Sequence, residues 1–140
     1  MAVERGMTLP EFGVYAAEHP EVDEELDRRL ADLARGGDAV IESRLAGWIA
    51  HNEGLTAVTV WIDCDPEVRA ARVAEREGVA LAEARADNEE RHAIERARYR
   101  ALYGLDLADT SIYDLVLDSV ALGPTEIGDR IVEAAHKLFA

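Results

Sequence analysis

The sequence is short of cysteine, aromatic residues and long apolar runs, and each shortage excludes a class of protein. Cys64 is the only cysteine, so no intrachain disulfide can form and a reducing compartment is expected. No apolar run approaches the length of a membrane span, and residues 1–6 carry no signal-like apolar segment. We therefore expect a cytoplasmic location and no membrane partner.

Basic residues are also scarce relative to acidic ones. The 140 residues include 29 acidic and 15 basic side chains, which gives a formal net charge of −14, and Lys137 is the only lysine. Duplex nucleic acids are bound by neutralising phosphates, so this balance argues against a nucleic-acid partner. A local cluster of arginines can still bind a small anion, and nucleotides remain possible ligands. The length fits a single domain, 1–140.

The chain alternates helical patterns with short apolar strands. Helices are expected over 8–18, 20–36, 66–77 and 80–103, and from residue 124 onward, with Asp65 and Pro66 opening the third of them. Strands are expected at 39–43, 57–63 and 115–117, and the second is apolar on both faces, as in a buried parallel strand. Three strands separated by helices predict an α/β fold with a parallel sheet and helices on both faces. Three strands are few for so many helices, which indicates an incomplete sheet.

The long helix over 80–103 carries the most suggestive side chains. Arg91, Glu95 and Arg98 are spaced i, i+4 and i+7, so they project from one helical face. The arginine fork matches the oxygens of a phosphate, and a carboxylate one turn away can orient it. The alternative is a solvated face of intrahelical ion pairs, which is common on acidic helices. The spacing alone leaves both interpretations open.

Arg44 follows the expected strand 39–43, at the edge where open α/β sheets bind ligands. The alternative is a turn arginine paired with a surface carboxylate. Three further arginines recur along the helix 66–77, and we expect them to form surface pairs with Glu75 and Glu77; they are Arg69, Arg72 and Arg76. The four histidines show no ligand-like spacing, and an N-cap explains Asp65, so no metal site built by the protein is expected.

Several motifs, taken in order, resemble the short, archaeal-type cytidylate kinases of the P-loop nucleoside monophosphate kinases. The resemblance covers essentially the whole chain, and the combination is far more specific than any single motif. The matching segments are Arg5-Gly6-Met7-Thr8-Leu9, Glu11-Phe12, Pro20-Glu21-Val22-Asp23, Leu26-Asp27-Arg28-Arg29, Ser43-Arg44-Leu45-Ala46-Gly47-Trp48, Asp65-Pro66-Glu67-Val68-Arg69, Glu95-Arg96-Ala97-Arg98-Tyr99, Tyr103-Gly104-Leu105-Asp106 and Ser111-Ile112-Tyr113-Asp114-Leu115-Val116. Ser43 stands where the family pattern has glycine.

The resemblance implies a P-loop kinase fold and transfer of the ATP γ-phosphoryl group to CMP or dCMP with Mg²⁺. It implies that 1–38 are acceptor-side helices and 79–104 a lid helix. Arg91 and Arg98 would be catalytic lid residues, while Arg44 and Glu95 would bind the substrate. The loop 119–122 would lie near the adenine.

One departure from the family pattern is large. No G-x-x-x-x-G-K-[ST] motif occurs in these residues, and Lys137 cannot replace its lysine. The resemblance therefore implies an N-terminally truncated domain that keeps three strands and lacks the central strand between 39–43 and 57–63. Such a domain is expected to be inactive alone and to self-associate. A non-catalytic remnant or regulatory partner of a nucleotide kinase is the main alternative, and a small P-loop kinase with another acceptor is a weaker one. The sequence does not decide between CMP, dCMP and UMP.

Overall fold

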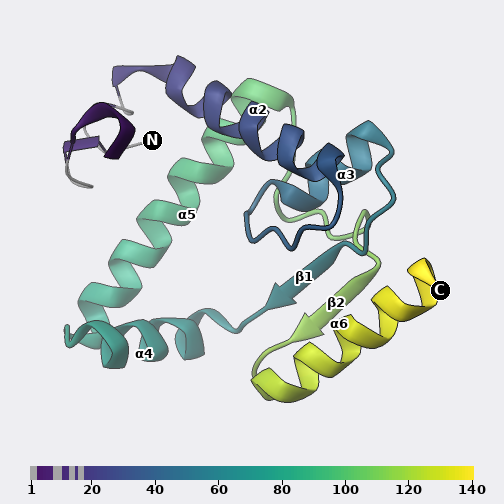
Figure 1. Cartoon of the computed structure of the whole chain (residues 1–140). Coiled ribbons are helices and arrows are strands. Elements are labelled where there is room, and N and C mark those ends of the chain that lie inside the picture. Colours follow the sequence, from purple (N-terminus) through teal and green to yellow (C-terminus); the bar gives the residue numbers. More distant parts are fainter. Residues whose placement is uncertain (1–2, 8–10, 13–14, 16–17) are drawn as a thin grey trace. The chain divides into compact units, whose positions relative to one another are not determined.

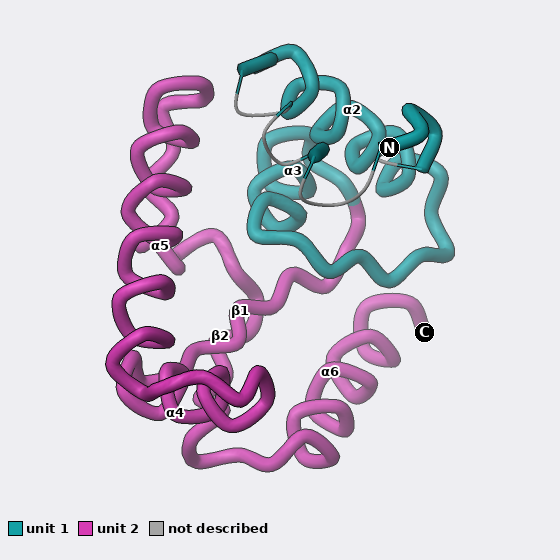
Figure 2. The backbone as a smooth tube through the Cα atoms, turned by 90° about the vertical axis from the view of Figure 1, so that its left-hand side faces the viewer, with its two compact units in different colours: residues 1–55 teal, residues 56–140 magenta. Residues whose placement is uncertain are grey.

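The computed structural model describes residues 3–7, 11–12, 15 and 18–140, in two compact units. Unit 1 spans Met1–Leu55 and unit 2 spans Thr56–Ala140, and both can be followed in Figures 1 and 2. Each unit is described by itself. The expected division into acceptor-side helices 1–38 and a lid helix 79–104 within one domain stays a prediction.

Unit 1 is helical in its described part. It contains the 3₁₀ turn η1 (Val3–Arg5) and the helices α2 (Pro20–Gly36) and α3 (Ala46–Glu53), and α2 packs against α3. Helix α2 begins at Pro20 as expected, because proline fits the first helical turn. Residues 11, 12, 15 and 18 of the helix expected over 8–18 are helical, and the other residues of that range lie outside the described ones. Helix α3 was not expected from the sequence.

The predicted strand at 39–43 is wrong. These residues have no regular secondary structure, and the side chain of Val40 is fully exposed. A strand exists only through hydrogen bonds to a neighbour, and the described residues of unit 1 contain no other strand for this segment to join. The prediction of three strands is corrected to two among the described residues.

Unit 2 confirms the predicted α/β class. Its elements are β1 (Val60–Asp63), α4 (Pro66–Glu77), α5 (Leu81–Tyr103), β2 (Leu115–Asp118) and α6 (Pro124–Phe139). The two strands pair in parallel, with Val60 opposite Leu115 and Asp63 opposite Asp118. Helices α4 and α5 form the connection between these strands, as a parallel pair requires (Figure 1).

The expected helix boundaries in unit 2 are confirmed by local contacts. Asp65 caps α4, because its Oδ1 accepts hydrogen bonds from the backbone N–H groups of Glu67 (2.9 Å) and Val68 (3.2 Å). Gly78 and Gly104 end α4 and α5 in left-handed conformations, with φ of 69° and 67°. The long helix is continuous over 23 residues.

The two strands are also joined at their amino ends by side chains. The carboxylate Oδ2 of Asp114 accepts hydrogen bonds from the backbone N–H (2.7 Å) and the hydroxyl (2.8 Å) of Thr59. The backbone N–H groups of Asp114 and Leu115 in turn donate to the carbonyl of Thr59. Next to this junction the rings of Trp61 and Tyr113 are 5.5 Å apart, and partial burial raises the pKa of Tyr113.

The prediction that the strand 57–63 is covered on both faces is wrong. None of the four residues of β1 is buried, and Ile62 is 52% exposed, whereas Leu117 on β2 is 5% exposed. Within the described residues each strand has one neighbour and therefore one open edge, so the sheet is too narrow for helices to enclose it. No described helix is both long enough and apolar enough for a bilayer crossing.

Candidate functional site

The carboxyl ends of β1 and β2 form the edge where open α/β sheets bind ligands. Each strand ends in an aspartate, and Asp63 and Asp118 stand opposite each other in register. The loop after β2 is held by short contacts. The backbone N–H of Ser119 donates to the carbonyl of Asp63 (2.9 Å), and Oδ1 of Asp118 accepts from the N–H of Val120 (2.8 Å). This edge therefore has a defined backbone conformation beside two carboxylates.

Arg72 of α4 reaches this edge. Its Nη1 donates to the hydroxyl of Ser119 (3.1 Å) and its Nη2 to the carbonyl of Ser119 (2.8 Å). The same Nη1 lies 3.6 Å from Sγ of Cys64. This contact was not predicted from the sequence, since the expected partners of Arg72 were Glu75 and Glu77. Only topology could have indicated it, since α4 follows one strand and Ser119 follows the other.

The neighbouring arginines of α4 behave differently. Arg76 pairs with Glu77 at 2.8 Å, which confirms the expected surface pair. Arg69 is half-buried, and its Nε makes no hydrogen bond to the described residues. The expected pairing with Glu75 and Glu77 therefore holds for one of the three arginines.

The predicted arginine face lies on α5. The helix is regular from Arg91 to Arg98, so these two side chains and Glu95 share one side of it. Nε of Arg91 donates to Oε1 of Glu95 at 3.1 Å. The Arg91 side chain is 71% exposed and that of Glu95 only 16%, so the carboxylate is largely shielded from solvent while the guanidinium stays open to it.

Arg98 is held by its neighbour Tyr99. Its Nη2 donates to the hydroxyl of Tyr99 (2.8 Å), and its Cζ lies 4.7 Å from the centre of the ring. Tyr99 is buried, and its ring stacks on that of Tyr103 at 6.4 Å. A buried ring therefore orients the planar guanidinium group of Arg98. The catalytic roles of Arg91 and Arg98, and the substrate-binding role of Glu95, stay predictions.

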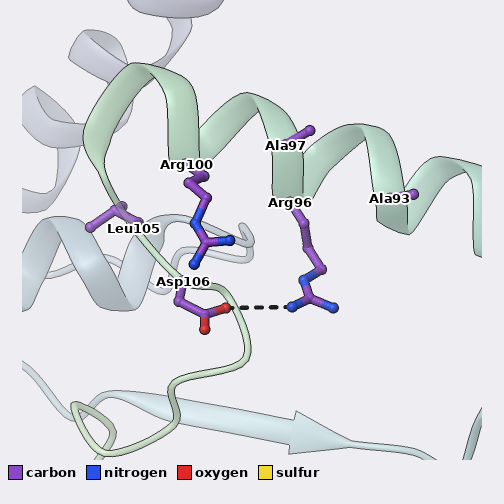
Figure 3. Close-up of a pocket in the computed structure, with 6 residues that line it drawn as sticks. All are labelled: Ala93, Arg96, Ala97, Arg100, Leu105 and Asp106. Carbon is purple, nitrogen blue, oxygen red and sulfur yellow. Dashed lines mark ion pairs between the residues drawn. The ribbon is translucent and has the colours of Figure 1, made fainter.

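A shallow hollow of about 240 Å³ lies on a different side of α5 (Figure 3). It is lined by Ala93, Arg96, Ala97, Arg100, Leu105 and Asp106. The guanidinium of Arg96 is 3.8 Å from the carboxylate of Asp106, and Arg100 points toward the same loop. None of the predicted site residues lines this hollow. Because it is open and includes a carboxylate, its shape alone does not indicate a ligand.

Arg44 belongs to unit 1. It lies half-buried in the turn that leads into α3, where the N–H of Leu45 donates to Oγ of Ser43 (3.1 Å). Ser43, which replaces a family glycine, therefore supports the turn with its side chain. The predicted role of Arg44 in binding the acceptor phosphate stays a prediction.

Two arginines of unit 1, Arg5 and Arg29, join η1 to α2 through ion pairs. Arg29 pairs with Glu25 (2.6 Å) and Glu4 (2.9 Å), and hydrogen bonds from Arg29 lower the pKa of both carboxyl groups. Arg5 pairs with Glu25 (3.3 Å) and donates to the hydroxyl of Tyr15 (3.2 Å). The Arg5–Glu25 and Arg29–Glu4 pairs join residues 20 and 25 positions apart, so they tie η1 to α2.

Comparison with known proteins gives a consistent result. The model of the cytidylate kinase-like family matches residues 3–121. The cytidylate kinase of Pyrococcus abyssi is 47% identical over 139 residues, which are 99% of this chain and 75% of that protein. The cytidylate kinase of Pyrococcus furiosus is 48% identical over 96% of this chain and 68% of that protein. That of Methanocaldococcus jannaschii is 45% identical over 85% of this chain and 67% of that protein.

No solved structure matches this chain. The family model nevertheless covers the arginine face of α5, the edge formed by β1 and β2, and the turn at Arg44. The resemblance inferred from the sequence motifs is confirmed, and the chain belongs to the cytidylate kinase-like family.

Proposed function

We propose that this chain acts in the transfer of the γ-phosphoryl group of ATP to CMP or dCMP, giving CDP or dCDP. The supporting observation is identity of 47–48% over nearly the whole chain with proteins named cytidylate kinase. The alignment with the Pyrococcus abyssi protein spans 139 residues, so it includes the helices that carry the arginines.

The α5 face suits the chemistry of this reaction. Phosphoryl transfer depends mainly on positioning and on stabilising charge that spreads over the transferring group. In our proposal Arg91 and Arg98 bind this charge, and Glu95 orients Arg91 through the 3.1 Å contact. Arg44 binds the phosphate of the acceptor nucleotide. Arg98 is restrained by Tyr99, so little conformational entropy is lost when it binds an anion.

The residues present also fit Mg²⁺. This ion usually keeps several waters and binds one or two carboxylates together with substrate phosphates. The described residues contain no cluster of three or more metal-binding side chains, so a closed protein cage is not available there. Asp63 and Asp118, in register at the strand ends, could hold Mg²⁺ together with nucleotide phosphates. When bound, the ion would neutralise charge on the phosphates.

A second candidate function is a nucleotide-binding partner without turnover. The observation that favours it is the lack of a G-x-x-x-x-G-K-[ST] motif in the 140 residues. In P-loop enzymes the backbone N–H groups and the lysine of this loop hold the β- and γ-phosphates. The arginines of α5 cannot supply such a ring of backbone donors. Both candidates predict CMP binding, and they differ in turnover.

The test combines binding and activity measurements. Calorimetry with CMP, dCMP and UMP is carried out on the 140-residue chain. ADP formation with each acceptor is then measured for this chain and for a chimera that adds the quarter of the Pyrococcus abyssi protein outside the alignment. We expect CMP or dCMP to bind both proteins, and acceptor-dependent ADP formation in the chimera alone.

A matched pair of variants controls for charge. Arg91 and Arg130 each form an i,i+4 pair with a glutamate, and the side chains of both arginines are exposed. Arg91→Ala should lower ADP formation, whereas Arg130→Ala should not. A chimera that binds CMP but never forms ADP would favour the partner without turnover. Preference for an acceptor other than CMP or dCMP would contradict the proposed substrate, and turnover by the short chain would show that its phosphate site is built from other residues.

A further inference from the structure

One side chain connects the segments that follow the two strands. Arg72 lies on α4, the helix that begins three residues after β1 ends. Its guanidinium spans two acceptors of Ser119, the first residue after β2, at 3.1 and 2.8 Å. The contact joins residues 47 positions apart, and it fixes a backbone carbonyl as well as a hydroxyl.

This contact differs from the other contacts of the loop. The hydrogen bonds from Val120 and Leu122 to Asp118 are local, and they define the shape of the turn. The N–H of Ser119 continues the pairing between strands by donating to Asp63. Unlike these, the hydrogen bonds from Arg72 come from a helix. They set where the turn lies relative to α4.

The chemistry of arginine suits this task. A guanidinium presents several donors in a rigid plane, so it can bind a carbonyl and a hydroxyl together, whereas a lysine ammonium has no fixed fork. The next arginine along the same row, Arg76, pairs with the adjacent Glu77, and its side chain is 72% exposed. The two arginines therefore offer a matched comparison on one helix.

We propose that Arg72 is a positioning residue that holds the 119–122 loop against α4 and so shapes the ligand edge of the sheet. Its consequence for catalysis rests on the proposed function and on the family resemblance, which implies that this loop lies near the adenine of ATP. Arg72 acts through Ser119, and no contact with the nucleotide is required of it.

The primary test is amide hydrogen exchange of the 140-residue chain, which needs no nucleotide. Arg72→Ala should speed exchange of the amides of Val120 and Leu122 about tenfold, because the turn loses its contact with α4 while the strands stay paired. Amides within β1 and α6 should change by less than twofold. Arg76→Ala should leave the loop unchanged, and Arg72→Lys should restore only part of the protection.

The second test separates loop positioning from a general loss of structure. In the chimera, Arg72→Ala should raise KM for ATP about tenfold and leave KM for CMP within twofold. Unchanged loop exchange in Arg72→Ala, or equally faster exchange throughout unit 2, would overturn the proposal. Equal increases in both KM values would overturn its link to ATP. If no protein forms ADP, the proposed function fails, and the exchange measurement still decides the role of Arg72.

Discussion

Replacing Asp114 should loosen the junction at the amino ends of the two strands. Asp114→Ala removes the acceptor for the N–H and the hydroxyl of Thr59, at 2.7 and 2.8 Å. Each hydrogen bond to a charged group is worth roughly 1.5–3 kcal/mol when buried, and less where water can replace the partner. Asp114 is exposed, so we expect a loss of about 2 kcal/mol in the free energy of unfolding. For a chain of this size that corresponds to a fall in Tm of about 5–8 °C.

Urea unfolding followed by circular dichroism, together with thermal melts, would measure this effect. Asp129→Ala is the control, because it removes an exposed carboxylate from α6. Asp114→Asn should lie between the two, since its amide oxygen can still accept a hydrogen bond. If Asp114→Ala and Asp129→Ala unfold at the same urea concentration, the junction does not stabilise the parallel pair and the argument from these distances fails.

Four further predictions concern catalysis, the backbone and pH. In the chimera, Arg98→Ala should lower kcat on the order of 100-fold and affect KM for CMP less, because charge on the transferring group develops in the transition state; near-normal steady-state kinetics would leave Arg98 with a purely structural role. Arg44→Ala should weaken CMP binding about 10- to 150-fold in calorimetry and leave ATP binding nearly unchanged. Equal weakening of CMP and ATP binding would mean that Arg44 supports the fold. Gly104→Ala should destabilise the protein by about 1 kcal/mol in urea unfolding, because φ there is 67°, and an unchanged midpoint would contradict this reasoning. Arg29 lowers the folded-state pKa of Glu4 and Glu25 below the ordinary value of 4.5. The stability that these two carboxylates contribute is therefore present above pH 4.5 and is lost as the pH falls below it. Thermal melts from about pH 6 to about pH 3 should show a smaller loss of stability in Arg29→Ala than in the unchanged protein.

The features predicted correctly from the sequence depend on residues close together in the chain. Asp65 caps α4 through N–H groups two and three positions away, and Gly104 ends α5 through its own backbone conformation. Such signals act within one turn, so the sequence contains all that is needed. The shared side of Arg91 and Arg98 follows in the same way from the regularity of a helix.

The wrong or missed features depend on distant partners. Residues 39–43 have the apolar composition of a strand, but composition does not provide a neighbouring strand. Helix α3 was missed because its own apolar residues do not form a stripe along one face. Gly47, Trp48 and Ala50 of this helix are all buried. The partner of Arg72 is Ser119, and nothing in the local pattern of α4 indicates a residue 47 positions away.

Helices α4 and α5 pack against each other, and their most buried residues are small. Ala70 of α4 and Ala84 of α5 are the most completely buried residues of these two helices, at 0% and 1% exposure. Small side chains let two helices approach closely. From Ala84 to the end of α5 at Tyr103 the helix is roughly 28 Å long, at about 1.5 Å per residue. A rotation of about 10° at this crossing would therefore carry the far end of α5 through roughly 5 Å, and Arg98 through somewhat less. Helix α5 is therefore long enough that a small change in its angle to α4 would move its far end by more than the length of a hydrogen bond.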